Sequence, residues 1–127
     1  MRIESSAMRA ARITSRLLAQ AAAQPASDTG QRWLLLQAAH VVGQGFFWSH
    51  VQVHIAMLAQ AGRGNAWCEM AGQLWRLALV PLGHLTGRLP WGNTGRSDVS
   101  AFRPMQPGPE LLALIESVRK CSAPNSQ

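Results

Sequence analysis

Three histidines lie close together in the sequence, on either side of a short break between two helical segments. His50 and His54 are four residues apart, so on a helix their β-carbons would share one face at a separation of about 5–6 Å. His40 precedes the break, which is centred near Gly45 and Phe46. A hairpin at this break places His40 level with the other two histidines. Because imidazole nitrogens bind transition metals, this spacing predicts a metal site.

A carboxylate on the following helix is the fourth candidate ligand. A second hairpin, with its turn near Arg63, brings Glu69 back toward the histidines, as a ligand or as a partner of a ligand. The predicted metal-site residues are His40, His50, His54 and Glu69. Imidazole suits Zn, Cu, Fe and Ni, so the metal stays open, and a haem-like ligand also fits. The sequence HVQVH lacks the glutamate of the HExxH motif and does not indicate a zinc protease.

The same histidines have a second interpretation as buried structural groups. Buried imidazoles are commonly hydrogen-bonded, and the glutamines near enough in sequence to be partners are Gln37, Gln44, Gln52 and Gln73. Ring nitrogens that point into one shared void would indicate a metal. Rings bonded separately to carbonyls or glutamines would indicate a structural role. We interpret His84 as unrelated to the cluster, because it lies beyond Pro81.

Five helices are predicted from the spacing of apolar residues and from capping and breaking signals. The predicted ranges are 6–24, 29–42, 49–61, 66–79 and 110–120. Asp28, Ser49 and Asn65 are the expected N-caps, and Pro81 and Gly83 are expected to loosen the end of the fourth helix. No strand pattern competes. The predicted fold is all-α, a small bundle of about five helices built from antiparallel hairpins with tetratricopeptide-like spacing.

Some side chains carry predictions about burial. Residues 49–61 are apolar on nearly all sides, which predicts a buried helix. The five tryptophans are expected to act as core and loop anchors. Cys68 is expected to pack beside Trp67 and Met70 rather than to act as a reactive thiol.

A long segment rich in glycine and proline, residues 86–109, separates the last two helices. Loops of this length are uncommon in compact domains. Its apolar residues Trp91, Val99, Phe102 and Met105 predict an ordered loop that wraps the bundle and closes over the site. The GNTG sequence can present backbone N–H groups to an anion. The residues available to such an anion are Asn93, Arg96 and Arg103.

The length of 127 residues fits one domain. We expect a helical domain over residues 1–120 and a disordered tail over residues 121–127, and we interpret the arginine- and serine-rich start as the first helix. Two cysteines give no disulfide framework, which favours a reducing, cytoplasmic compartment. No apolar run reaches the roughly 20 residues that a membrane span needs.

The net charge of +6 comes mainly from arginines scattered singly along the chain. Nucleic acid is therefore not an expected partner, since its binding needs a clustered basic patch. Only 14% of residues are charged, which fits a surface covered by a partner protein or a second copy. The alternative function is thus a non-catalytic interaction or homodimerising module with structural histidines. No nucleophile has a local base partner, so we assign no enzyme activity.

Four segments resemble a known family. They are AHVVGQ (39–44), HVQVHIAML (50–58), EMAGQLWR (69–76) and GNTG…VSAFRPM (92–105). Together they are similar to the bacterial domain-of-unknown-function family 3703, over about residues 10–114. The family has no established activity, so the resemblance implies positions rather than a reaction, and these include the four predicted metal-site residues. Arg96 stands where the family usually has glycine, which argues against a positive φ there.

Overall fold

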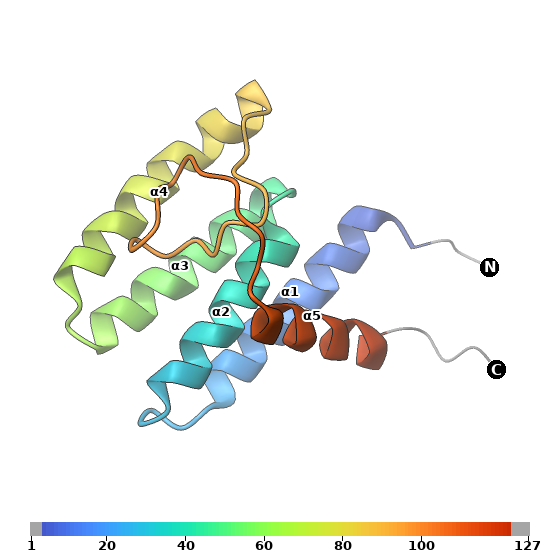
Figure 1. The fold of residues 1–127 in the computed structure, drawn as a ribbon, viewed down its shortest axis with the longest axis horizontal. Coiled ribbons are helices and arrows are strands. Elements are labelled where there is room, and N and C mark those ends of the chain that lie inside the picture. Colours follow the sequence, from blue (N-terminus) through green and yellow to red (C-terminus); the bar gives the residue numbers. More distant parts are fainter. Residues whose placement is uncertain (1–3, 123–127) are drawn as a thin grey trace.

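The computed structural model describes residues 4–122, and its regular structure is entirely helical. The helices are α1 (Ser6–Ala23), α2 (Thr29–Gly43), α3 (Phe47–Arg63), α4 (Trp67–Thr86) and α5 (Pro109–Ser122). Helices α1 to α4 run in alternating directions, and α5 lies across α1 and α2 (Figure 1). The prediction of a small all-α bundle is confirmed. None of the described helices is long and apolar enough to cross a membrane.

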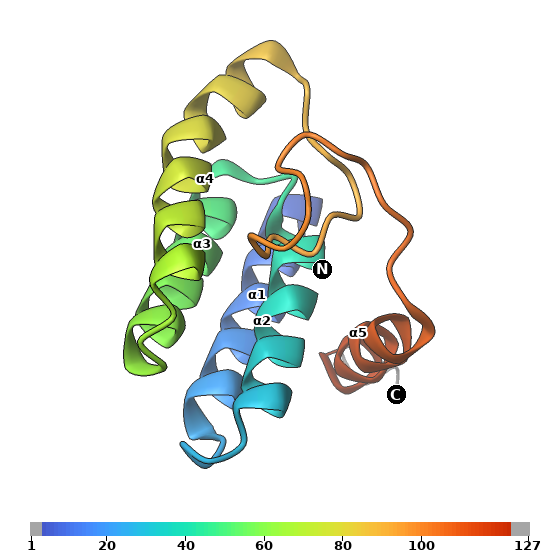
Figure 2. The ribbon, with the colours of Figure 1, turned by 60° about the vertical axis from the view of Figure 1, so that its left-hand side comes forward.

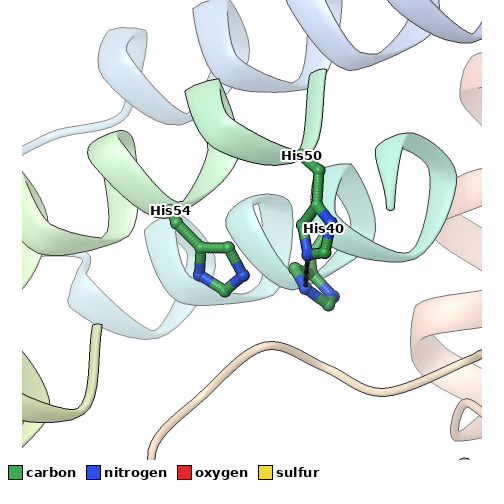
Figure 3. Close-up of side chains that lie close together, drawn as sticks. All are labelled: His40, His50 and His54. Atoms are coloured by element: carbon green, nitrogen blue, oxygen red, sulfur yellow. Dashed lines mark hydrogen bonds between the residues drawn. The ribbon is translucent and has the colours of Figure 1, made fainter. Parts of the chain in front are cut away.

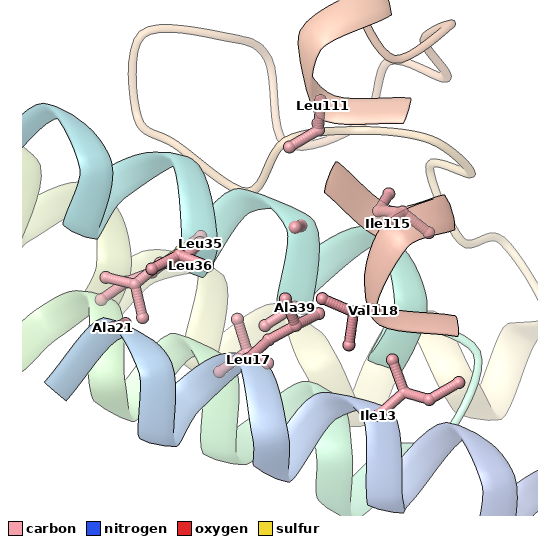
Figure 4. Close-up of a cluster of buried hydrophobic side chains, with 12 residues drawn as sticks. Ile13, Leu17, Ala21, Leu35, Leu36, Ala39, Leu111, Ile115 and Val118 are labelled. Atoms are coloured by element: carbon pink, nitrogen blue, oxygen red, sulfur yellow. The ribbon is translucent and has the colours of Figure 1, made fainter. Parts of the chain in front are cut away.

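The apolar core lies mainly between α1, α2 and α5, with two side chains from α3 (Figure 4). Its members are Ile13, Leu17, Ala21, Leu35, Leu36, Ala38, Ala39, Val53, Met57, Leu111, Ile115 and Val118. Helix α4 contributes nothing to this cluster. Its buried residues are Glu69, Gln73, Arg76 and Val80. The space between α4 and the rest of the molecule is therefore largely polar, and this is where the histidines lie.

The N-caps agree with the sequence prediction at one of three helices. The carboxylate of Asp28 accepts a hydrogen bond of 3.1 Å from the N–H of Gln31 and caps α2 as predicted. The predicted caps of α3 and α4 are wrong, because neither helix has a side-chain cap. Ser49 is buried in the first turn of α3. Asn65 adopts a left-handed φ of 53°, which Asn tolerates better than most residues.

Helix α4 continues past Pro81 to Thr86, whereas the sequence predicted an end near residue 79. Proline inside a helix removes one backbone donor, but here it does not end the helix. The helix ends at Gly87, which has a φ of 69° and donates its N–H to the carbonyl of Gly83. The two additional turns place His84 beside α3, where its ring contacts His50.

The predictions about large side chains are wrong at several positions. The exposed tryptophans are Trp48, Trp67, Trp75 and Trp91. Only Trp33 packs against the core, half-buried. Cys68 is exposed, and Ile55 is 53% exposed, so α3 is not buried on all sides. The physical reason is position: α3 and α4 form one edge of the bundle (Figure 1), and their outward faces have no helix against them.

Residues 87–108 form no helix or strand and lie between the α3–α4 hairpin and α5 (Figure 2). Polar groups hold this loop to the bundle. The amide of Gln44 donates to the carbonyl of Pro90 (2.9 Å) and accepts from the N–H of Gly92 (3.1 Å). Of the predicted apolar anchors, Trp91 and Phe102 are exposed. Of the predicted tail, residues 121 and 122 belong to α5, and residues 123–127 lie outside the described part of the chain.

Candidate metal centre

Three histidines from two helices meet in the interior. His40 comes from α2, and His50 and His54 come from successive turns of α3 (Figure 3). Each is at most 5% exposed, and one ring nitrogen from each lies within 4.8 Å of the others. The predicted convergence across the α2–α3 hairpin is therefore confirmed. The loop passes beside the rings on the side away from α3 (Figure 3), and its Asn93 carbonyl contacts His40.

The protonation of His40 follows from its partners. Its Nδ1 atom lies 2.6 Å from the carbonyl oxygen of Asn93. A carbonyl only accepts, so His40 carries its proton on Nδ1 and leaves a lone pair on Nε2. This Nε2 lies 3.1 Å from the Nε2 of His50. The proton of that contact is therefore donated by His50.

His54 is oriented in the same way by an amide. Its Nδ1 atom lies 2.7 Å from the Oε1 of Gln73. The amide nitrogen of Gln73 donates to Glu69 and to the carbonyl of Gly95, both at 2.8 Å, which fixes the orientation of the amide. His54 therefore donates through Nδ1, and its Nε2 lone pair is left for a ligand.

His84 belongs to the cluster, and the prediction that it is unrelated is wrong. Its Nε2 atom lies 3.0 Å from the Nδ1 of His50. The reason is that α4 continues past Pro81. A signal for this was present in the sequence: Glu69, Gln73, Arg76, Val80 and His84 follow one another at intervals of three or four residues, which places them on one helix face.

Glu69 lies outside the group of converging ring nitrogens. One carboxylate oxygen accepts from the backbone N–H of Ser97 (3.0 Å) and from Gln73, and the other accepts from the Ser97 hydroxyl. Although burial raises the pKa of Glu69, the hydrogen bonds from Ser97 and Gln73 lower it below its usual value. The carboxylate thus acts on His54 through Gln73 rather than directly.

Asn93 is the first of the three residues predicted to bind an anion. The Asn93 side chain is fully buried, and it donates to the carbonyls of Ser100 and Arg103, both at 2.8 Å, while accepting from the N–H of Gly95 (2.9 Å). Its polar atoms are therefore used inside the loop. Its own carbonyl, which binds His40, is the part of Asn93 that contributes to the site.

The two predicted arginines have other surroundings. The guanidinium of Arg96 lies 3.9 Å from the ring centroid of Trp33 and 3.7 Å from a carboxylate oxygen of Glu69. The side chain of Arg103 is exposed. Sequence reasoning did not assign Arg76, whose buried side chain lines the cavity at the histidines.

Burial keeps the histidines neutral. Desolvation is the main cause that lowers the pKa of His40 well below its ordinary value. It also lowers the pKa of His50 to about 3 and that of His54 to about 4. The pKa of His84 is lowered by the same effect. Neutral imidazole is the form that binds metals, and at neutral pH each ring therefore has one unprotonated nitrogen.

Gly95 brings the loop backbone directly against the site. It has a φ of 83°, and a Cβ atom at this position would lie 2.6 Å from Cδ2 of His40. Only glycine accommodates both the conformation and the contact. This explains the second glycine of GNTG as a requirement for packing against an imidazole.

A cavity of about 480 Å³ reaches the cluster from the surface. The deep part is formed by the three histidines, with Arg76 and Val80 beside them, and all five are buried. A ligand bound to the histidines would therefore have one side open to this cavity.

Comparison with known proteins identifies the family of this chain but no chemical reaction that it catalyses. No curated protein and no solved structure matched the chain. One family model matched most of it, over a range that includes all four histidines. The chain belongs to the family described as "Protein of unknown function (DUF3703)", whose model matches residues 7–115.

Proposed function

We propose that this protein binds one transition-metal ion through the Nε2 atoms of His40, His50 and His54. The observation that carries the proposal is the convergence of three buried, neutral imidazoles whose ring nitrogens lie within 4.8 Å of one another. His40 and His54 already direct their Nδ1 protons outward, to a carbonyl and to an amide oxygen. Metal-binding histidines almost always have such a partner on the second nitrogen.

For His50 to have a free Nε2 and a proton on Nδ1, as His40 and His54 do, its tautomer has to change. Without metal, its Nε2 donates to His40 and its Nδ1 accepts from His84. A metal on Nε2 moves the His50 proton to Nδ1, where the Nε2 lone pair of His84 accepts it once His84 has also changed tautomer. His84 is then the outer partner of His50, as Asn93 is of His40.

The size of the cluster fits a small ion after a modest inward movement of the rings. Zn–N bonds of about 2.0–2.1 Å place tetrahedral ligand nitrogens about 3.3 Å apart. The present separations extend to 4.8 Å. Three protein ligands leave a fourth position, and this position faces the cavity. Sites of this kind suit Zn, Cu, Fe or Ni, with Glu69 supporting His54 through Gln73.

The test is the metal content of the purified protein and its titration with Co²⁺ or Zn²⁺ after chelation. We expect one equivalent per chain and visible ligand-field bands with Co²⁺. The double variant His50→Ala/His54→Ala should lose both. The matched control is Gln52→Ala, because Gln52 lies between the two histidines on the exposed side of α3. Equal, substoichiometric metal in all three proteins would reject the proposal.

A second function, self-association, is favoured by a different surface. The outward face of α4 is apolar along its whole length, and we name it the α4 face. Its members are Trp67, Ala71, Leu74, Trp75, Ala78, Pro81, Leu82 and Leu85, all of them exposed. The two charged residues of α4, Glu69 and Arg76, are buried on the opposite side.

The occupant that fits the α4 face is a second copy of the chain. A net charge of +6 makes two copies repel each other over most of their surfaces. An uncharged apolar face is where this repulsion is weakest and burial of apolar area is most favourable. A twofold pairing would place α4 of one copy antiparallel to α4 of the other. This proposal is compatible with metal binding, because the histidines lie on the other side of α4.

A further inference from the structure

The cavity beside the histidines contains a buried cation, Arg76, that has no carboxylate within ion-pair distance, although the charges of Glu69 and Asp98 act on it from further away. The side chain of Arg76 is 7% exposed, and its guanidinium donates only to the carbonyls of Val99 and Gly72. None of the ion pairs in the described part of the chain includes Arg76. Buried charges are normally neutralised by a paired charge. Arg76 is therefore a site at which an anion is favoured.

Arg76 is close to the histidines on which the proposed metal depends. Both line the deep part of the same cavity. After burial, the charge of Arg76 is among the causes that lower the pKa of His40 and His54. A divalent cation bound at the histidines would add two further positive charges in this space. No aspartate or glutamate lines the cavity, so inside the cavity an anionic ligand would be the direct partner of these positive charges, while Glu69 and Asp98 act on Arg76 from outside it.

The remaining walls are apolar and lead toward the surface. Leu79, Val80, Leu89 and Phe102 line the cavity, and Phe102 is 69% exposed and lies at its mouth. The second cation of the lining, Arg88, is also exposed. The cavity thus has a positive inner end and an apolar channel. Its volume of about 480 Å³ falls within the range of small-molecule sites.

We propose that this cavity binds a small organic carboxylate, with its carboxylate between the metal ion and Arg76 and its apolar part against Leu79, Leu89 and Phe102. The inference rests on the proposed metal site, because the metal supplies one of the two partners of the carboxylate. The inner end of the cavity would offer two positive partners, the metal ion and Arg76, and each could bind one of the two carboxylate oxygens. A phosphate has more oxygens than a carboxylate and would need further hydrogen-bond donors. The side-chain amide of Asn93 cannot supply them, because it already donates to the carbonyls of Ser100 and Arg103.

The test uses phenylacetate, its neutral analogue phenylacetamide, and acetate, which lacks the apolar part. Each is titrated into the Co²⁺-loaded protein, and binding is followed by calorimetry and by the change in ligand-field bands. Phenylacetate should bind more tightly than both analogues and should change the bands. Inorganic phosphate, added as a fourth probe, should bind more weakly.

Variants then assign the contacts. Arg76→Met should weaken phenylacetate binding by about 10-fold to 100-fold, the range expected for loss of a charged hydrogen bond. Arg63→Gln is the matched control, since Arg63 is an exposed arginine at the end of α3, away from the cavity lining. If Arg76→Met does not fold, Phe102→Ala remains informative. It should weaken phenylacetate binding several-fold and leave acetate binding unchanged.

The outcomes separate this inference from the proposed function. Failure of Co²⁺ to bind rejects the metal site and the carboxylate site together. Stoichiometric Co²⁺ with equal affinity for phenylacetate and phenylacetamide rejects only the carboxylate site. Tighter binding of phosphate than of phenylacetate would also reject it and would leave the metal site standing.

Discussion

The Nε2 atom of His84 lies 3.0 Å from the Nδ1 atom of His50, although 34 residues separate them in the chain. This contact joins the last turn of α4 to the first turn of α3. In the metal-free protein His84 donates to this nitrogen of His50; in the proposed metal-bound state His84 would instead accept the His50 proton at Nδ1 and leave Nε2 for the metal. His84 is thus a positioning residue whose influence on the metal passes through His50.

Substitution of His84 tests this relationship. His84→Leu removes the acceptor and should lower the affinity for Zn²⁺ or Co²⁺ by about 10-fold to 100-fold, as is typical for loss of an outer partner. The stoichiometry should stay at one, because the three ligands are unchanged. His84→Gln should restore most of the affinity, since an amide oxygen can accept the same proton. Equal loss in both variants would show that His84 contributes by packing alone, and competition with a chelator measures the affinities.

The buried histidines predict a pH dependence of stability in the metal-free protein. The pKa of His54 in the folded protein is about 4, below its ordinary value of 6.5, mainly because the ring is buried, so between these two pH values the unfolded chain binds more protons. Stability is therefore complete above pH 6.5 and falls as the pH drops toward 4. A shift of this size corresponds to about 3 kcal/mol for one histidine. Urea unfolding at a series of pH values measures the effect.

Between pH 4.5 and 6.5 the change in stability is expected to come from the buried histidines rather than from Glu69. The pKa of Glu69 is lowered from 4.5, so loss of stability from its protonation begins only below that value. In His50→Gln/His54→Gln the slope over this window should be smaller than in the unchanged protein. The same slope in both proteins would contradict the conclusion that these imidazoles are buried in the neutral form.

Two glycines of the loop allow a matched test of its contact with His40. Gly95→Ala introduces a Cβ atom 2.6 Å from the ring at a φ of 83°, and should destabilise the protein by about 1–3 kcal/mol. It should also weaken metal binding, because the carbonyl of Asn93 moves with the loop. Gly108→Ala is the control, since no atom lies near its Cβ position and its φ is not in the left-handed region. Equal melting temperatures for the two variants would contradict the role of Gly95.

Much of the fold and part of the site could be predicted from local sequence patterns. The helical spacing of Ile13, Leu17 and Ala21 gives the buried face of α1, and the i, i+4 spacing of His50 and His54 gives one face of α3. The turn between α2 and α3 is short enough to make their antiparallel pairing nearly unavoidable. These are short-range relations, for which the period of the helix is sufficient.

The errors arise where tertiary contacts outweigh local preference. Pro81 is a helix breaker by local rules, yet α4 continues through it, and His84 was missed for that reason. The contact between the Asn93 carbonyl and His40 depends on the path of the folded loop, so local sequence could not predict it. Tryptophans are assigned to the core by hydropathy, which does not distinguish a buried face from an apolar face without a partner.

The α4 face leads to the final prediction, that the chain forms a dimer which one lysine can disrupt. Trp75 is 56% exposed and lies near the middle of the face. In a twofold arrangement it is therefore next to its own copy. Trp75→Lys brings two like charges together across that axis and should convert the dimer to a monomer in light scattering after size exclusion. Leu112→Lys alters a similarly exposed apolar residue on α5, a helix that does not contact α4, and should leave the dimer intact. A wild-type monomer at micromolar concentration would reject self-association through this face, whereas the metal site would be unaffected.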